Sequence, residues 1–277
     1  MDKSLPPGLH IVATPIGNLG DLSPRAAETL RRADRILAED TRVTAKLLTH
    51  IGAKVPMSRY DDHSSEAERG RIVAKLDEEA IALVSDAGTP LISDPGYKLV
   101  RAARAAGRAV HTVPGPSAVV AALSLAGLPT DRFLFTGFLP AKAKARSDSI
   151  TEMAHVRATL VLYESGPRLA ETLAVLRDKL GTRDAAVIRE ISKLYEECVT
   201  GSLPELAERY AGAAPRGEIV IVIGPPGETA EASDEVLDAA LDEALSRLSP
   251  SRAAATVAQE LGTSRKRAYA RALERSK

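Results

Sequence analysis

The sequence predicts an α/β fold made of two α/β domains and a small helical module at the C-terminus. Short runs of β-branched and other apolar residues alternate with segments of helical pattern, which is typical of a parallel sheet covered by helices. A chain of 277 residues with 44% hydrophobic content is long enough for two modest domains. Residues 229–277 carry a helical pattern only, which predicts a separate module there.

The first domain is predicted over residues 1–127. Ser23 and Pro24 are typical of a helix N-cap and first turn, and Gly52 is typical of a helix end. The predicted strands are 9–14, 34–40, 81–86 and 109–113, and the predicted helices are 23–33, 43–52, 64–79, 96–107 and 117–127.

The second domain is predicted over residues 128–228 and begins with a break. The segment 128–148 contains two prolines and ends in the basic stretch "PAKAKARSD", so we expect a loop there. Strands are then predicted at 158–165, 184–192 and 217–224, and helices at 166–181 and 203–212. The stretch "PPG" at 225–227 ends this domain, and the third part covers residues 229–277.

The composition excludes several classes of function. Lys plus Arg and Asp plus Glu both number 37, so the net charge is zero and no global field indicates a nucleic-acid partner. With Cys198 as the single cysteine and five histidines without ligand spacing, the sequence predicts no disulfide and no metal site. The chain shows neither a signal peptide nor an apolar run of membrane-spanning length, so a cytoplasmic protein is expected.

Three loops rich in glycine and proline follow predicted strands of the first domain. They read "TPIGNLGD" at 14–21, "SDAGTPLISDPG" at 85–96 and "PGPSA" at 114–118. Ligands of open parallel sheets bind beyond the carboxyl ends of the strands, where glycine lets the backbone approach closely. Asp86 in the second loop can hydrogen-bond a ribose or an amino group. The loops therefore predict a cofactor pocket, although each loop alone could simply form a turn.

The spacing of these glycines does not identify the ligand. No GxGxxG motif follows the first strand, which disfavours a Rossmann dinucleotide site, and the absence of GxxxxGK[ST] excludes a P-loop. The residues alone indicate an α/β enzyme with a small anionic or nucleoside-like ligand.

Six motifs together resemble a known family. "VATPIGNLGDLSPRA", "LAEDTR", "VSDAGTPLISDPG", "VPGPSA", "DRFLFTGFLP" and "LYESGPR" occur in this order between about residue 9 and residue 224. They resemble the family of ribosomal RNA small subunit methyltransferase I, which has the tetrapyrrole-methylase (class III) fold. The resemblance implies a cofactor cleft between two α/β domains and S-adenosylmethionine as cofactor. It also implies a homodimer that methylates the ribose 2′-oxygen of a decoding-centre cytidine in 16S rRNA.

The resemblance also implies the cofactor-binding residues, largely through their backbone. These are Pro15 of the first loop, Ala87, Gly88, Thr89 and Ile92 of the second, Ser117 and Ala118 of the third, and Tyr163, Glu164 and Ile191 of the second domain.

The stretch "LAEDTR" provides candidates for the chemistry. Methyl transfer to a ribose hydroxyl requires alignment and removal of the hydroxyl proton. Glu39 or Asp40 could act as base or orient the ribose, and Arg42 could hold a phosphate. Asp40 or Thr41 could equally be the N-cap of the helix that follows.

Basic residues at two places in the second domain are candidates for RNA contact. Lys142, Lys144 and Arg146 alternate on the predicted loop, where they would border the cleft and meet phosphates. Arg189 and Lys193 in "REISK" are further candidates. A solvated surface without a partner is the alternative for both groups.

The tail has an uneven distribution of charge. Residues 231–250 contain six acidic residues and one basic residue, whereas residues 251–277 contain seven basic and two acidic ones. Ala258 and Gly262 followed by "TSRKRAY" have the rhythm of a helix-turn-helix, in which Arg265, Lys266 and Arg267 would begin the second helix and contact RNA. A dimerising or capping helical hairpin is the alternative.

Two other functions are compatible with these patterns. The same fold could methylate a tetrapyrrole or another small acceptor, which the basic loop and tail disfavour. A non-enzymatic regulator that binds nucleic acid through its tail is a third possibility.

Overall fold

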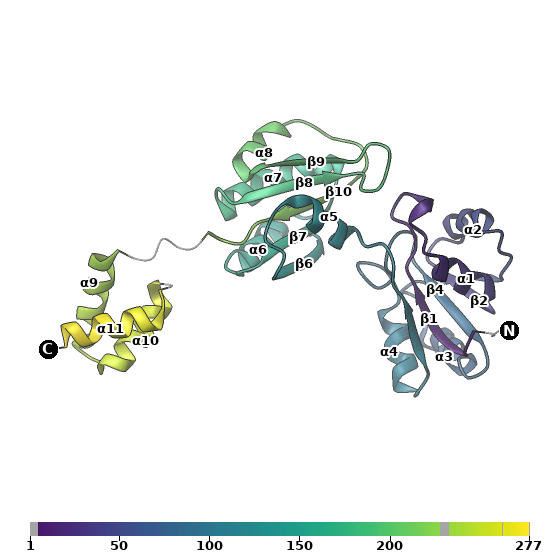
Figure 1. The fold of residues 1–277 in the computed structure, drawn as a ribbon, viewed down its shortest axis with the longest axis horizontal. Coiled ribbons are helices and arrows are strands. Elements are labelled where there is room, and N and C mark those ends of the chain that lie inside the picture. The colour runs from purple at the N-terminus through teal and green to yellow at the C-terminus, as the bar shows by residue number, and fades with distance from the viewer. Residues whose placement is uncertain (1–4, 228–232, 262, 277) are drawn as a thin grey trace. The chain divides into compact units, whose positions relative to one another are not determined.

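The computed structural model describes residues 5–227, 233–261 and 263–276. The chain divides into two compact units, residues 1–224 and 225–277, and the first unit contains two five-stranded sheets (Figure 1). The predicted boundary at 228/229 and Gly262 of the predicted turn lie outside the described residues. In the described ranges, no helix is long and apolar enough to cross a membrane.

The first sheet is entirely parallel, as the sequence predicts, with strand order β3-β2-β4-β1-β5. Its elements are β1 (Gly8–Val12), the 3₁₀ turn η1 (Leu19–Asp21), α1 (Pro24–Arg32), β2 (Arg35–Ala38), α2 (Thr41–His50), β3 (Met57–Arg59), α3 (Glu66–Lys75), β4 (Ala80–Val84), α4 (Tyr97–Ala105) and β5 (Val110–Val113).

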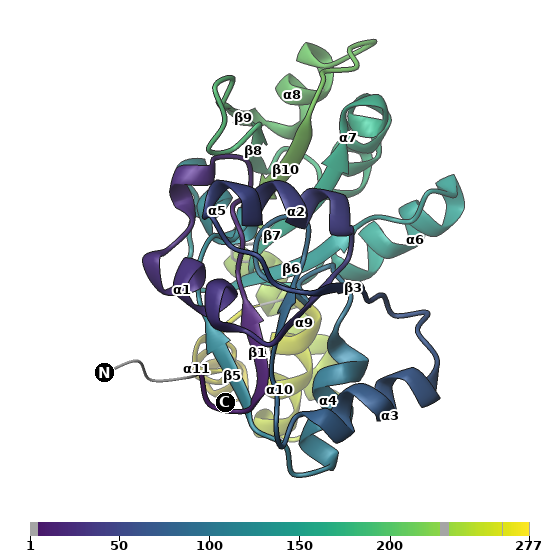
Figure 2. The same cartoon turned by 90° about the vertical axis from the view of Figure 1, so that its right-hand side faces the viewer.

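Helices cover both faces of this sheet because its strands alternate between two cores. Ala82 and Val84 of β4 pack with α1 and α2, whereas Ile81 and Leu83 pack with α3 and α4. Figure 2 shows α1 and α2 on one side of the strands and α3 and α4 on the other. With both faces covered, the loops at the carboxyl ends of the strands are left to form a site.

The second sheet is mixed, with strand order β6-β7-β10-β8-β9. Its elements are β6 (Phe133–Phe138), α6 (Ala143–Met153), β7 (Thr159–Ser165), α7 (Gly166–Leu180), β8 (Asp184–Arg189), β9 (Glu197–Ser202), α8 (Leu203–Arg209) and β10 (Glu218–Ile223). Only β6 and β7 are parallel; β10 is antiparallel to β7 and β8, and β9 is antiparallel to β8. The prediction of a parallel sheet is therefore wrong for this half. A short connection without a helix joins β8 to β9, and it forces an antiparallel return.

The predicted break at 128–148 is also wrong. Residues 133–138 form β6 and residues 143–153 form α6. The strand is interrupted by a shift of register between Phe135 and Gly137, and Gly137 has a φ of 66°. Because of this bulge, the strand lacks the regular alternation of apolar and polar residues by which a strand is recognised in a sequence.

One helix of the first half packs on the second sheet. The side chains of α5 (Ala118–Ala126), among them Val119, Ala122 and Leu123, join the core formed by Val161 of β7 and Val220 of β10. Figure 1 shows α5 beside the strands of the second sheet. Helices α6, α7 and α8 pack on the opposite face. The packing thus groups α5 with the second half, whereas the predicted division at residue 127/128 stays a prediction.

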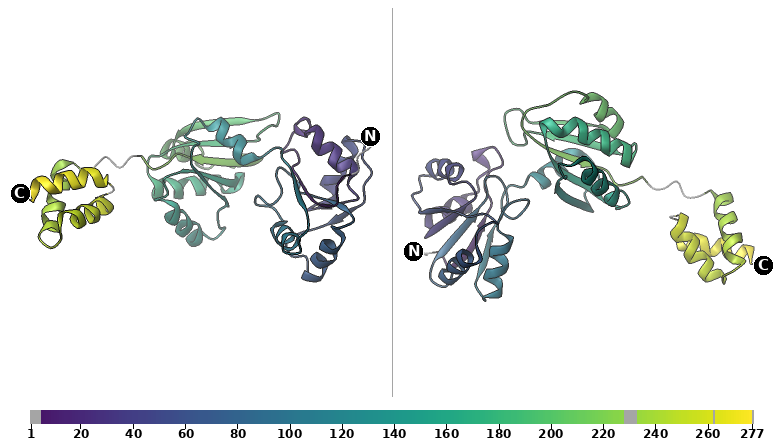
Figure 3. Two further views of the ribbon diagram at one scale, coloured as in Figure 1. Left: turned by 60° about the horizontal axis from the view of Figure 1, so that its bottom comes forward. Right: turned by 180° about the vertical axis from the view of Figure 1, so that it is seen from behind.

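The second unit consists, in its described residues, of three helices, which Figure 3 shows from two sides. They are α9 (Asp234–Leu245), α10 (Pro250–Leu261) and α11 (Arg265–Arg275). A small core of leucine, valine and alanine joins them. Ser264 caps α11 by accepting a hydrogen bond from the backbone N–H of Arg267.

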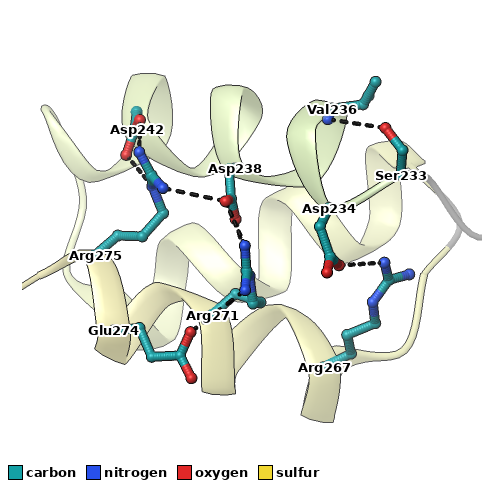
Figure 4. A network of polar contacts seen from close by, with 9 residues as sticks. All are labelled: Ser233, Asp234, Val236, Asp238, Asp242, Arg267, Arg271, Glu274 and Arg275. Carbon is teal, nitrogen blue, oxygen red and sulfur yellow. Dashed lines mark hydrogen bonds and ion pairs between the residues drawn. The ribbon is translucent and has the colours of Figure 1, made fainter.

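Ion pairs between α9 and α11 fasten this unit (Figure 4). Every fourth residue of each helix takes part: Arg267 pairs with Asp234, Arg271 with Asp238, and Arg275 with both Asp238 and Asp242. The acidic and basic segments of the tail therefore neutralise one another across a helix interface.

Candidate active site

Hydrogen bonds join the three glycine-rich loops at the carboxyl edge of the first sheet. Thr14 and Gly88 exchange backbone hydrogen bonds in both directions, at 2.9 and 3.1 Å. The hydroxyl of Thr89 donates to the carbonyl of Pro116, at 3.0 Å. Loops 14–21, 85–96 and 114–118 are thus held against one another as one surface.

The stretch "LAEDTR" is bound to the same surface. The backbone N–H of Asp40 donates to the carboxylate of Asp86, at 3.0 Å. The Asp40 side chain itself accepts from the backbone N–H of Arg42, at 2.8 Å, and is the N-cap of α2. The capping alternative therefore holds for Asp40.

Positive φ angles at non-glycine residues mark two loops of the first unit. Leu91 and Ser93 have φ values of 76° and 65°, and Glu190 and Ser192 in the loop after β8 have values of 53° and 66°. Such conformations are unfavourable for residues with a Cβ atom and are concentrated at functional sites. Both loops contribute residues to the same cavity.

A cavity of about 300 Å³ lies between these loops. Nine of the eleven residues predicted to bind the cofactor line it: Ala87, Gly88, Thr89, Ile92, Ser117, Ala118, Tyr163, Glu164 and Ile191. The structure therefore brings together residues that are far apart in the sequence, from both halves of the first unit.

A second cavity of about 330 Å³ adjoins the first. The two remaining predicted residues, Pro15 and Asp86, line this second cavity. Ile16, Ala87 and Glu218 line both cavities and form a shared wall. The arrangement offers space for two ligands with their ends close together.

Some residues of the first cavity were not predicted from the sequence, and two of them matter most for its chemistry. Asp94 and Phe138 both line it, and Phe138 is 58% exposed. Burial raises the pKa of Asp94 to about 6, a hydrogen bond from Ser85 opposes the rise, and the nearby Glu39 carboxylate adds to it. Asp94 is the second aspartate of "SDAGTPLISDPG". It goes unnoticed when the aspartates of this stretch are interpreted only as residues that favour turns.

Aromatic rings form one wall of the first cavity. The ring of Tyr163 packs edge-on against Phe135 and Phe138, with centroids 4.8 and 5.5 Å apart. Burial raises the pKa of Tyr163 to about 12, so its hydroxyl is protonated at neutral pH. The wall thus combines apolar area with a fixed hydrogen-bond donor.

The carboxylate of Glu164 points into the protein rather than into the cavity. Glu164 is 2% exposed and accepts hydrogen bonds from the Thr172 hydroxyl, at 2.6 Å, and from the Ser165 backbone, at 2.8 Å. Arg168 lies 3.4 Å from the same carboxylate. A ligand in the cavity would therefore meet the Glu164 backbone.

The three predicted catalytic residues have different environments. Burial raises the pKa of Glu39, and the neighbouring Asp86 carboxylate adds to the rise. In contrast, hydrogen bonds from Arg42 hold the pKa of Asp40 at about 2. Arg42 is exposed and engaged with Asp40, so a phosphate would have to compete for it.

The placement of the predicted basic loop is corrected by the structure. Lys142 is the N-cap residue of α6, and Lys144 is exposed on that helix and pairs with Asp148 at 2.7 Å. The Arg146 side chain is 1% exposed and pairs with Glu171. Arg146 faces the interior because it falls on the apolar side of the helix, next to Ile150. Its predicted RNA contact is therefore not supported.

The other predicted RNA-binding residues are partly engaged in ion pairs. Arg189 pairs with Glu197 at 3.2 Å, and Lys193 pairs with Glu190 and Glu218 at 3.0 and 2.8 Å. Lys193 also lines the second cavity.

The three basic residues at the start of α11 differ in exposure. Arg265 and Lys266 are exposed, whereas Arg267 is half-buried and pairs with Asp234 at 2.7 Å. Two of the three side chains thus face solvent.

Comparison with known proteins identifies the family. A family model described as Tetrapyrrole (Corrin/Porphyrin) Methylases matches residues 8–207, and one described as the RsmI C-terminal HTH domain matches residues 230–276. A ribosomal RNA small subunit methyltransferase I from Erythrobacter litoralis is 54% identical, covering 98% of this chain and 96% of its own. The chain belongs to the ribosomal RNA small subunit methyltransferase I family.

Further relatives agree with this membership. The ribosomal RNA small subunit methyltransferase I of Xylella fastidiosa is 48% identical, over 96% of this chain and 99% of its own. Among solved structures, diphthine synthase has a TM-score of 0.62 at 16% identity, over 78% of this chain and 89% of that chain. Uroporphyrin-III-C-methyltransferase from Thermus thermophilus has a TM-score of 0.54 at 23% identity, over 78% and 93%. These structures show the fold alone, and the match to the family model confirms the predicted tetrapyrrole-methylase class.

Proposed function

We propose that the chain transfers a methyl group from S-adenosylmethionine to the ribose 2′-oxygen of cytidine 1402 in 16S rRNA, at the decoding centre. Relatives at 43% to 54% identity that carry the name ribosomal RNA small subunit methyltransferase I support the activity. The observation that carries the proposal is the cavity that unites nine predicted cofactor residues beside a second cavity.

The residues of the first cavity fit S-adenosylmethionine. A volume of about 300 Å³ is at the lower end of ligand pockets. Its walls combine backbone of the loop 87–89 with the rings of Phe138 and Tyr163, which suits an adenosyl group. Asp94 provides a negative charge for a cationic ligand. When bound there, the cofactor supplies a methyl group attached to a positively charged sulfur, and this sulfur is the leaving group of the transfer.

The second cavity is our candidate for the acceptor nucleotide. It is lined by the hydroxyl-bearing residues Thr14, Thr44 and Ser85 and by Lys46 and Lys193, which suit ribose and phosphate groups. Because the two cavities share a wall, an acceptor here would place its hydroxyl close to the cofactor. Holding both groups in line is the larger part of the catalytic task.

The tail is our candidate for a further RNA contact. Arg267, Arg271 and Arg275 of α11 are engaged in ion pairs with α9. Arg265 and Lys266, in contrast, are exposed at the beginning of α11. The match to a helix-turn-helix model supports a nucleic-acid partner for this helix.

The family also supports two finer proposals. We infer that the protein acts as a homodimer, and that exposed apolar residues such as Val120 and Phe133, which are 60% and 47% exposed, belong to the interface. We also infer that it acts in the cytoplasm, where a substrate made of ribosomal RNA is found.

Transfer of tritiated methyl groups tests the proposed function. We expect incorporation into small ribosomal subunits with S-adenosylmethionine as donor, and none into free tetrapyrrole. Incorporation into tetrapyrrole alone would contradict the proposal and favour a small acceptor.

A further inference from the structure

The connection between β8 and β9 exposes an apolar pair, Leu194 and Tyr195, at its tip. Leu194 is 89% exposed and Tyr195 is 70% exposed, which are the highest values among the large apolar side chains of the described residues. In the described part of the chain, no hydrogen bond or ring contact engages the Tyr195 side chain. A single exposed apolar residue is ordinary, but an adjacent pair at a loop tip indicates a surface that contacts a partner.

The tip is a tight turn whose backbone is fixed by hydrogen bonds. The N–H of Lys193 donates to the Glu190 carbonyl at 3.0 Å, and the N–H of Glu196 donates to the Lys193 carbonyl at 3.2 Å. The Glu196 carboxylate accepts a further hydrogen bond from the Ser192 N–H, at 2.6 Å. The apolar pair occupies the two central positions of the turn 193–196, so the fixed backbone holds both side chains out toward solvent.

This turn is fastened to the first glycine-rich loop, beside the second cavity. Lys193 lines that cavity, and a Cβ atom at Gly17 would lie 2.5 Å from its Cε atom. The Ser192 hydroxyl donates a hydrogen bond to the Asp21 carboxylate. The apolar pair therefore follows directly, in the chain, a residue in the wall of the cavity that we assign to the acceptor nucleotide.

The charges around the apolar pair suit a base better than a phosphate. Residues 189–197 hold three acidic and two basic side chains. Both basic ones are engaged: Arg189 pairs with Glu197 at 3.2 Å, and Lys193 pairs with Glu190 and Glu218 at 3.0 and 2.8 Å. A neutral, flat ring can lie on the tip without competing with these ion pairs. Every RNA base offers such a ring, on which an aromatic side chain can stack.

The acceptor RNA requires a stacking partner at this place. A nucleotide whose ribose enters a cavity is drawn out of the regular stack, so the base next to it loses a neighbour. RNA-binding proteins cover such unstacked bases with aromatic side chains. A tyrosine that is already held in place does so at a low cost in conformational entropy.

We propose that Tyr195 stacks on an unpaired RNA base next to the acceptor nucleotide, and that Leu194 packs against the same nucleotide. This inference rests on the proposed function, which places the acceptor in the second cavity. Tyr195 lines neither cavity, so it is a positioning residue for the RNA. A contact between two copies of the chain is the competing use of the pair. Two side chains are a small part of such an interface, which buries about 800 Å² on each partner.

Three substitutions of Tyr195 separate a stacked base from other contacts. The probe is a protein-free, single-stranded oligoribonucleotide that spans the acceptor position. Tyr195→Ala should weaken its binding about 5- to 100-fold, the usual range for the loss of one stacked base. Tyr195→Phe keeps the ring and should bind as the unmodified protein does, whereas Tyr195→Leu keeps only apolar volume and should lose nearly as much as Tyr195→Ala. S-adenosylmethionine affinity should be unchanged in all three.

Salt dependence and kinetics distinguish stacking from a phosphate contact and from a structural role. Stacking releases no counterions, so Tyr195→Ala should bind more weakly at every salt concentration with the same salt dependence as the unmodified protein. On small ribosomal subunits, KM should rise while kcat stays within a few-fold. A flatter salt dependence in Tyr195→Ala would indicate a lost phosphate contact and overturn the proposal.

Fluorescence provides a direct readout of stacking. The chain contains no tryptophan, so Tyr195→Trp places a single indole at the tip, and a base stacked on it should quench its emission as the oligoribonucleotide is added. Tyr97→Trp is the matched control, because Tyr97 is 60% exposed and lines neither cavity. Its emission should stay unchanged. Equal quenching at the two positions would contradict a base bound at the tip.

The remaining outcomes also decide the question. Full RNA affinity in Tyr195→Ala or in Tyr195→Leu would overturn the proposal. A change of oligomeric state in Tyr195→Ala, measured by analytical ultracentrifugation, would overturn it as well, because the pair would then belong to a contact between copies of the chain. Failure of the proposed function is distinct, since the unmodified protein would then transfer no methyl group to small ribosomal subunits, whatever the variants bind.

Discussion

Asp40 and Arg42 form an ion pair at the first turn of α2, with the Arg42 Nη2 atom 2.6 Å from the Asp40 Oδ2 atom. The Asp40 carboxylate also caps the helix, and hydrogen bonds from Arg42 hold its pKa at about 2. A carboxylate of such low basicity is a weak general base at neutral pH.

The first prediction follows from this pair. Asp40→Ser retains a side chain that caps helices, so we expect folding to persist and kcat to stay within a few-fold of the unmodified protein. Steady-state kinetics on small ribosomal subunits measure this. A loss of about 100-fold or more in kcat, with intact cofactor binding, would restore Asp40 as the base.

The second prediction concerns a contact between loop 85–96 and loop 14–21. Gly88 has a φ of 82°, and a Cβ atom there would lie 3.1 Å from the Cγ2 atom of Ile16. Gly88→Ala should therefore displace the cavity wall and weaken S-adenosylmethionine binding in calorimetry.

Gly52→Ala is the matched control for this variant. Gly52 has a φ of 66° and nothing within 4 Å of an added Cβ atom. Both variants should lose roughly 1–2 kcal/mol of folding free energy through left-handed strain. Equal cofactor affinity in the two variants would show that Gly88 lies outside the binding surface.

The third prediction separates the basic residues of α6. Arg146→Ala removes a buried side chain and should cost about 2–5 kcal/mol of stability, measured by denaturant unfolding. Lys142→Ala with Lys144→Ala should leave stability unchanged. If these lysines contact phosphates, the double variant should flatten the salt dependence of RNA binding. An unchanged salt dependence of RNA binding would show that these lysines do not contact phosphates.

The fourth prediction concerns the beginning of α11. Replacement of Arg265 and Lys266 by alanine should raise KM for the ribosomal substrate and leave cofactor affinity unchanged, since both side chains are exposed. Arg252→Ala, which removes an exposed charge from α10, is the control. If all variants show the KM of the unmodified protein, the tail does not contact RNA through this helix.

The fifth prediction concerns the ion pairs between α9 and α11. Asp238 receives both Arg271 and Arg275, and Asp238→Asn should lower the unfolding temperature of the tail. Glu243→Gln is the control, because Glu243 pairs only with Arg247 of its own turn among the contacts of the described residues. The chain contains no tryptophan, so Tyr269→Trp provides a fluorescent reporter in α11.

The pH dependence of this stability has a definite sign. Hydrogen bonds from Arg271 hold the pKa of Asp238 below its usual range, and Arg275 does the same for Asp242. The stabilisation is therefore present above the pKa of the unfolded chain, about 3.9, and is lost as the pH falls through the folded values. A tail equally stable at neutral and acid pH would contradict this role.

The sequence predicted the buried strands far better than the edge strands. β3, β6 and β9, which it missed, each lie at the edge of a sheet. An edge strand pairs on one side only, so it needs less apolar character, and β6 is also broken by the bulge at Gly137. The partner of α5 could not be predicted either, because the packing of Val119 and Ala122 on the second sheet depends on contacts distant in sequence.

The candidate site was predicted where backbone loops define it. Gly88 and Ala118 lie at the cavity as expected, since loops after parallel strands must meet at one edge. Side-chain orientation could not be predicted in the same way. Arg146 and Glu164 point into the interior, and the environment of Asp94 depends on Ser85, Asp86 and Glu39, which only the folded chain brings together.

Mass spectrometry of the RNA product tests the central claim most directly. Small ribosomal subunits that lack the modification would be incubated with the protein and S-adenosylmethionine, and the 16S rRNA digested to nucleosides and to mapped fragments. We expect one added methyl group, on the ribose of cytidine 1402, and none in the absence of the protein. A methyl group on a base, at another position or absent altogether would contradict the proposed function.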